Sequence, residues 1–141
     1  YDHIERYDTF LQVLQENGIP FGKENYYQGD YSVQSGIRAG NLMAMGENLP
    51  DAVVCANDNM AAGVVQSFLK QGIRVPEDVS VSGFDGDPLA ELSDKYLTTA
   101  VIPRYEMGYL AAETLVKMIR QETSPIIRRI KAPIVWREST R

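Results

Sequence analysis

The chain has 141 residues, of which 44% are hydrophobic and 23% are charged, a composition typical of one globular domain with a single core. Its formal net charge of -5 argues against direct binding to nucleic acid, because such binding needs clustered Lys and Arg. No apolar segment approaches the roughly 18 residues of a membrane span, and the single cysteine, Cys55, has no second cysteine for an internal disulfide.

The first third of the chain predicts two helices with a short strand between them. Apolar residues recur at helical spacing from Ile4, and "ENGIP" supplies a terminating Gly and Pro, so we expect a helix over residues 4–17. The segment "YYQGDYS" is expected to form a short strand and a loop. Ser32 is then placed to cap a second helix that runs to about Met45.

The middle of the chain predicts two buried strands joined by a helix. The apolar run Ala52–Ala56 lies between "LPD" and "NDN", which suits a fully buried strand. A helical apolar stripe follows and ends at Gly72, and a second buried strand is expected over Val79–Gly83. Strands that alternate with helices at short spacing predict parallel pairing through right-handed crossovers, and so an α/β fold with a parallel sheet.

The last third predicts a long helix between strand segments. "LTTAVIP" is followed by a helical pattern over about Tyr105–Arg120, which "SP" ends. The final stretch "IIRRIKAPIVWRES" is expected to contain one or two strands.

Polar side chains follow two of the predicted strands. Asn57 and Asp58 come directly after the first buried strand, and Asp85 ends the second. Because neighbouring parallel strands present their carboxyl ends at the same edge of a sheet, we expect these side chains on one rim, where ligands bind in open α/β sheets. The alternative is local: Asp58 or Asn59 caps the next helix, and "DGDP", with Asp87, is turn chemistry. For Asp85 we favour a functional role.

Amide and carboxylate groups together suit a neutral polyhydroxylated ligand, because they donate to and accept from several hydroxyls. A sugar or a nucleoside fits better than a phosphate. Arg6, near the start of the first helix, and Tyr31, in "GDYS", are further candidates for contacts with such a ligand. The alternatives are a solvated helix residue for Arg6 and a packing ring for Tyr31.

Enzymatic interpretations have less support in the sequence. There is no Gly-rich phosphate-binding loop, no Gly-x-Ser-x-Gly elbow and no His-rich metal motif, and no cofactor is indicated. The single histidine, His3, lies near the start of the chain. The alternative is a Mg²⁺ site on Asp58 and Asp85, as in a phosphoacceptor domain, which would need a partnering Lys that no motif identifies.

Several motifs occur in order along the chain: "R-x-x-x-F", "GIP", "GDYS", "AND-x-MA-x-G", "VPEDVSV-x-GFD", "LTT" and "MG-x-x-A". Together they resemble the effector-binding region of the lactose-repressor/galactose-repressor family of bacterial transcription regulators. The resemblance implies a periplasmic-binding-protein-like fold, in which two α/β lobes with helices on both faces of each sheet close on a small effector. The chain would supply the C-terminal lobe, residues 1–97 and 126–141. Residues 98–125 would be a strand and helix that cross to the other lobe.

The resemblance also implies functional residues and partners. Arg6, Tyr31, Asn57 and Asp85 would contact a sugar-like or nucleoside-like effector. Operator DNA would be bound only through a helix-turn-helix outside this chain, in a cytoplasmic protein that forms a homodimer or a domain-swapped oligomer. The alternative within the same fold is a periplasmic solute-binding protein for sugar transport.

Two positions depart from the family pattern. Many members carry Gln-Pro where this chain has Ile102-Pro103, a change that removes a polar group near the hinge. The usual second Asp after "GFD" is Gly86, a change expected to alter the turn more than the ligand site.

Overall fold

The computed structural model describes residues 2–92, 95–122 and 129–141. Most of its elements follow the alternating order that the sequence predicts, with boundaries within a few residues of those expected; a 3₁₀ helix and a short helix over residues 89–92 were not predicted. In chain order they are α1 (Asp2–Glu16), the 3₁₀ helix η1 (Lys23–Asn25), α2 (Val33–Ala44), β1 (Ala52–Val54), α3 (Asp58–Lys70), β2 (Ser80–Asp85), α4 (Leu89–Leu92), β3 (Thr98–Val101), α5 (Arg104–Ile119) and β4 (Ile134–Val135).

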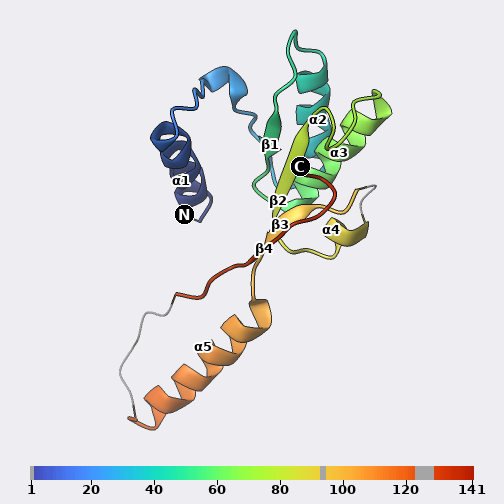
Figure 1. The fold of residues 1–141 in the computed structure, drawn as a ribbon. Helices are drawn as coiled ribbons and strands as arrows, with labels where there is room; N and C mark the ends of the chain where they lie inside the picture. Colours follow the sequence, from blue (N-terminus) through green and yellow to red (C-terminus); the bar gives the residue numbers. More distant parts are fainter. Residues whose placement is uncertain (1, 93–94, 123–128) are drawn as a thin grey trace.

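The strands form one four-stranded sheet in the order β1-β2-β3-β4. β1, β2 and β3 are parallel, and β4 pairs with β3 in the antiparallel direction. α2 and α3 lie on one side of the sheet and α1 lies on the other (Figure 1). The prediction of an α/β fold with a parallel sheet and helices on both faces is confirmed for β1, β2 and β3, whereas the antiparallel pairing of β4 was not predicted.

The core lies between the sheet and α3, which α2 covers from outside. Val64, Val65 and Phe68 of α3 are at most 2% exposed, and Val81 of β2 is fully buried. Ser32 caps α2 through its side chain, which accepts a hydrogen bond from the Ser35 backbone N–H. The predicted stripe, the cap and the helix end near Gly72, whose φ is +77°, are therefore confirmed.

Two predicted strand features are wrong. β1 is not fully buried, because it lies at the edge of the sheet: Val53 packs on the core, whereas Val54 points to the opposite side and is 60% exposed. "YYQGDYS" forms no strand, because its polar groups bond locally instead. The Asp30 N–H donates to Ser35 Oγ at 3.2 Å, and the Ser32 N–H donates to Asp30 Oδ1 at 3.1 Å.

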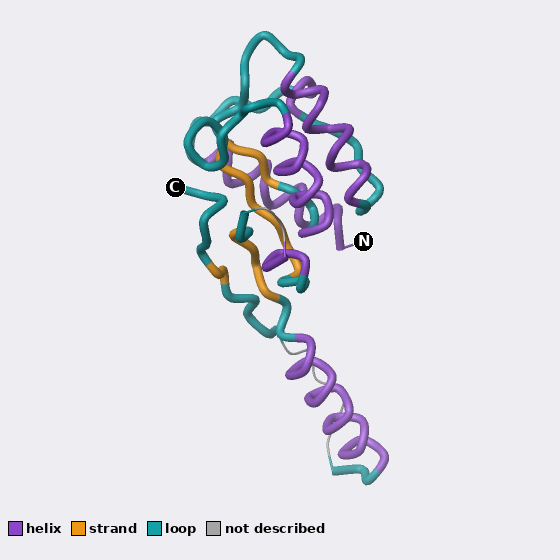
Figure 2. Tube along the Cα trace, turned by 90° about the vertical axis from the view of Figure 1, so that its right-hand side faces the viewer, coloured by secondary structure: helices purple, strands orange, loops and turns teal. Residues whose placement is uncertain are grey.

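α5 projects away from the sheet in both overall views (Figures 1 and 2). None of its residues is buried, and Tyr105 and Ile119 are 87% and 73% exposed. Residues 98–101, which we expected to cross to the other lobe, pair with β2 as strand β3 of this sheet. The first residues of the predicted final strands, 126–128, lie outside the described residues, whereas Ile134–Val135 form β4. None of the described helices is both long and apolar enough to span a membrane.

Candidate functional site

The carboxyl ends of β1, β2 and β3 meet at one rim of the sheet, as the parallel register requires. The Ile102 N–H donates to the Asp85 carbonyl oxygen at 3.2 Å, which joins the end of β2 to the residue after β3. The Asp87 N–H donates to Asp58 Oδ2 at 2.7 Å, which joins the residues after β2 to the start of α3. The structure therefore brings Asn57, Asp58 and Asp85 to the same edge.

Asn57 is the N-cap of α3. Its Oδ1 accepts from the Met60 N–H at 3.0 Å, and its Nδ2 donates to the Tyr31 carbonyl oxygen at 3.0 Å. The alternative that Asp58 or Asn59 is the cap is wrong, because Asn57 holds the extended backbone that a cap requires, with φ -155° and ψ 173°. Asn57 is only 7% exposed, and its amide links the start of α3 to the Tyr31 loop.

Asp85 ends β2 in a strained backbone conformation. Its φ is +109°, which side-chain-bearing residues rarely adopt and which persists only where surrounding contacts enforce it. Burial raises the pKa of the Asp85 carboxyl, and Asp58 and Asp87 raise it further, while the nearby Arg6 and Arg104 lower it. The carboxylate is thus partly desolvated among charges of both signs, a pattern typical of functional sites.

Arg6 anchors α1 to this rim. Its Nη1 donates to the Ala56 carbonyl oxygen at 2.8 Å, and its guanidinium carbon lies 4.4 Å from the centre of the Phe84 ring. A cation over an aromatic face is attracted by the ring quadrupole. The structure therefore places Arg6 against the sheet beside Asp85 rather than in a solvated position.

Tyr31 lies in the loop before α2 with φ +64°. Its carbonyl oxygen accepts from Asn57 Nδ2, and the residue is 43% exposed. Asp30 braces the loop: it accepts from the Ser32 backbone and hydroxyl and pairs with Arg38 at 3.2 Å. The hydrogen bonds from Ser32 and Ser35 are the main reason that the pKa of Asp30 is well below its usual range. The Tyr31 ring is thus exposed on a backbone that is fixed at both ends.

Two residues next to Asp85, Phe84 and Gly83, were not predicted from the sequence to belong to the site. Phe84 shares a sheet face with its β3 partner Ala100 and lies beneath Arg6. Gly83 faces Asp58, whose Oδ1 would lie 2.1 Å from a Cβ at that position. The alternation of side chains along a strand could have identified both. In a strand that ends at Asp85, positions 84 and 83 point to opposite faces of the sheet.

The Mg²⁺ interpretation gains no support from the described residues. Among them, no group of three or more His, Cys, Asp or Glu side chains is arranged to hold a metal ion. One oxygen of Asp58 is occupied by the Asp87 N–H. Burial, with a contribution from Asp58, raises the pKa of the Cys55 thiol to about 12, which disfavours a thiolate nucleophile.

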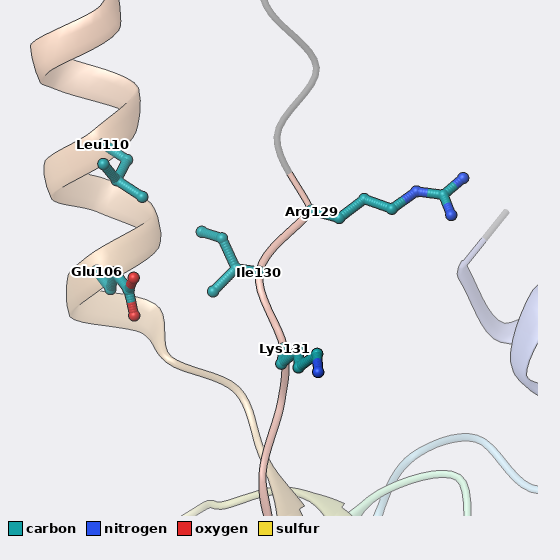
Figure 3. A pocket seen from close by; sticks show the side chains of 5 residues that line it. All are labelled: Glu106, Leu110, Arg129, Ile130 and Lys131. Atoms are coloured by element: carbon teal, nitrogen blue, oxygen red, sulfur yellow. The ribbon is translucent and has the colours of Figure 1, made fainter.

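An open pocket lies away from the rim, between α5 and residues 129–131 (Figure 3). Leu110 of α5 and Ile130 face one another across it, whereas the Arg129 side chain points away. The residues lining it are Glu106, Leu110, Arg129, Ile130 and Lys131. None of the four predicted effector contacts belongs to this pocket, so it does not define the candidate site.

A parallel-dominated sheet with helices on both faces and a polar rim is typical of a lobe of the periplasmic-binding-protein-like class. The family model described as "Periplasmic binding protein-like domain" matches residues 1–140. The chain is 31% identical over 142 residues to Catabolite control protein A of Priestia megaterium, covering 99% of this chain and 42% of that protein. It is 33% identical over 137 residues to the HTH-type transcriptional repressor CytR of Escherichia coli, covering 96% of this chain and 40% of that protein.

Among solved structures, the complex of transcriptional regulator CelR with cellobiose superposes with a TM-score of 0.84 at 30% identity, covering 96% of this chain and 42% of that one. The chain belongs to the lactose-repressor/galactose-repressor family of transcription regulators. It spans less than half of the length of these relatives. Regulators among the relatives favour the regulator interpretation over the periplasmic transport protein.

Proposed function

We propose that this chain is the effector-binding and dimerising part of a bacterial transcription regulator, and that its effector is a sugar-like or nucleoside-like molecule. The observation that carries the proposal is the rim at which Asp85, with φ +109°, lies beside Arg6. Its support comes from the repressor CytR among the relatives and from the cellobiose complex of CelR.

Each rim residue has a distinct proposed role. Asp85 accepts hydrogen bonds from effector hydroxyls, which suits its partly buried carboxylate. The Arg6 guanidinium donates to effector oxygens from the α1 side, and the exposed Tyr31 ring forms an apolar wall. Asn57 contributes its remaining amide hydrogen and lone pair while it caps α3.

The chain would act as one lobe of a two-lobe domain. Residues 1–97 and 126–141, with β3, form this lobe, and the segment after β3 crosses to the other lobe. The effector favours one arrangement of the lobes, and this preference is transmitted to a helix-turn-helix that binds operator DNA in the complete cytoplasmic regulator. The effector therefore acts by shifting a population between two states.

We further propose that the chain self-associates as a homodimer or a domain-swapped oligomer. The support is the uncovered α5, where Tyr105, Leu115 and Ile119 are 57% to 87% exposed. Light scattering on the 141-residue chain at micromolar concentration should give a mass of at least two chains. A mass of one chain at that concentration refutes self-association.

The effector proposal is tested on the complete regulator by a thermal-shift screen with cellobiose, lactose, glucose and uridine. At least one of these is expected to raise the melting temperature of the wild type. Asp85→Ala should lose most of that shift, because the carboxylate no longer accepts from hydroxyls. Asp51→Ala, which removes an exposed carboxylate at the opposite end of β1, is the matched control and should keep it. Equal shifts for Asp85→Ala and the wild type would exclude Asp85 as a contact.

A further inference from the structure

Asp58 is the one carboxylate with a fully buried side chain among the residues that the structure describes. Burying a charged group is costly unless hydrogen bonds compensate it. The start of α3 offers partial compensation, because exposed N–H groups at a helix N-terminus favour negative charge. Such a position calls for a role that a neutral or exposed residue would not fill.

The two oxygens of Asp58 have different surroundings. Oδ2 accepts the Asp87 N–H at 2.7 Å, a short charge-assisted hydrogen bond between α3 and the segment after β2. Oδ1 is buried against Gly83 and has no hydrogen-bond partner among the described residues. The carboxylate therefore has one strong bond, and that bond goes to the turn that follows Asp85.

This turn contains two consecutive residues with positive φ, Asp85 at +109° and Gly86 at +65°. The Asp87 N–H is the first donor after that reversal, and it is the one that Asp58 holds. From the β3 side the contacts are weaker: Thr99 Oγ1 accepts the Gly86 N–H at 3.4 Å, and the Asp85 carbonyl accepts the Ile102 N–H at 3.2 Å. Asp58 thus supplies the shortest of the bonds that enforce the strained backbone of Asp85.

We propose that Asp58 is a positioning residue of the effector site: its buried carboxylate holds the turn after β2 and so fixes the direction in which Asp85 presents its own carboxylate. The proposal rests on the proposed role of Asp85 as an effector contact. Asp58 itself is not a contact, since its side chain is fully buried. The absence of a side chain at Gly83 allows Asp58 to take this position, because a Cβ there would displace Asp58 Oδ1.

The first test measures the turn without any effector, by amide hydrogen exchange on the 141-residue chain. Asp58→Asn keeps the shape of the side chain but replaces a charge-assisted bond with a neutral one. The Asp87 amide should then exchange about five to ten times faster. The three-bond HN–Hα coupling of Asp85, which reports φ, should change in the same variant. Asp51→Asn makes the same chemical change at an exposed site and should alter neither quantity.

The Val81 amide separates positioning from loss of overall stability. It donates to the Ser139 carbonyl at 2.7 Å in the buried part of β2, so it exchanges only when the core opens. Positioning predicts that the Asp87 rate rises relative to the Val81 rate. A general loss of stability would accelerate both equally, and that result overturns the proposal.

Two further measurements keep the proposal testable if Asp58→Asn does not fold. In the wild type, the Asp87 amide should be protected, and exchange at the rate of an unstructured peptide overturns the proposal. Gly83→Ala pushes Asp58 without changing any charge, and it should also accelerate Asp87 exchange relative to Val81. Unchanged relative exchange in a folded Gly83→Ala overturns it as well.

The link to the effector is tested on the complete regulator with the same four compounds, cellobiose, lactose, glucose and uridine. The affinity for the compound that binds the wild type most tightly should fall about tenfold in Asp58→Asn and should be unchanged in Asp51→Asn. A loosened turn with unchanged affinity overturns the positioning role. If none of the four binds, the exchange data still decide whether Asp58 controls the turn, so failure of the effector assignment is distinguished from failure of this inference.

Discussion

Substituting Gly63 by Ala tests whether the close contact between α2 and α3 is a requirement of this fold. Gly63 lies in α3 where it meets the first turn of α2. A Cβ built on Gly63 would lie 2.1 Å from the Val33 carbonyl oxygen, 2.8 Å from the Ile37 nitrogen and 3.0 Å from the Gly36 Cα. All three are backbone atoms, so the two helices must separate before an Ala fits.

Two effects of opposite sign compete in Gly63→Ala. Ala in a helix interior is more favourable than Gly by about 1 kcal/mol. Overpacking a close-packed site costs about 1–3 kcal/mol and occasionally more, and backbone neighbours place this site at the upper end of that range. We therefore expect a net loss of roughly 2 kcal/mol in the free energy of unfolding. The displacement would also move the start of α3, which carries Asn57 and Asp58 to the rim.

Urea unfolding followed by circular dichroism measures this change, with Gly108→Ala as the matched control. Gly108 is also inside a helix, α5, but a Cβ there would have no neighbour within 4 Å. The control should leave the free energy of unfolding unchanged or raise it by up to about 1 kcal/mol. If Gly63→Ala stabilised the chain as much as Gly108→Ala does, the contact between α2 and α3 would not require a glycine at position 63.

Three further predictions concern the caps and the rim. Asn57→Ala should lower the free energy of unfolding by about 1–2 kcal/mol in urea titrations, whereas Asn57→Asp, which keeps the cap, should lose less; equal losses would argue against capping. Ser32→Ala should cost about 1 kcal/mol by thermal melting, and no change would show that the Ser32 cap of α2 contributes nothing. Burial raises the folded-state pKa of Asp85 above its ordinary value of 3.8, so ionisation opposes folding at neutral pH and this cost disappears as the pH falls through the raised pKa. Asp85→Asn should therefore unfold at higher urea than the wild type at pH 7, and the difference should shrink as the pH falls toward 3.8; a difference independent of pH contradicts this reasoning.

Local patterns along the chain were sufficient to predict most of the secondary structure. The apolar stripe of α3, the Ser32 cap of α2 and the Gly72 end of α3 depend on neighbours a few residues away, and all three are present. The parallel register also follows from the alternation of strands and helices, and it places Asn57 and Asp85 on one rim. These features were predictable because hydrophobic periodicity and capping act over short distances in sequence.

Only the tertiary structure decided which strands pair, which strand lies at the edge of the sheet and which distant residues contact one another. Whether β1 is central or at an edge depends on which other strands lie beside it, so the exposure of Val54 could not be inferred from an apolar run. The assignment of the α3 cap to Asn57 and the burial of Asp58 depend on the Tyr31 loop and the turn at Asp87, 26 and 29 residues away in sequence.

The same distinction applies to the site. The sequence by itself determined that carboxylate and amide groups follow the strands, because strand ends are marked locally by polar residues. Only the tertiary structure showed that Arg6 reaches Phe84 and the Ala56 carbonyl from the far side of the sheet. It also showed that the Asp58 side chain is fully buried and accepts a hydrogen bond from the turn after β2, and is not exposed at the rim. The direction of a side chain at a rim is set by contacts between segments distant in sequence, and no local pattern encodes them.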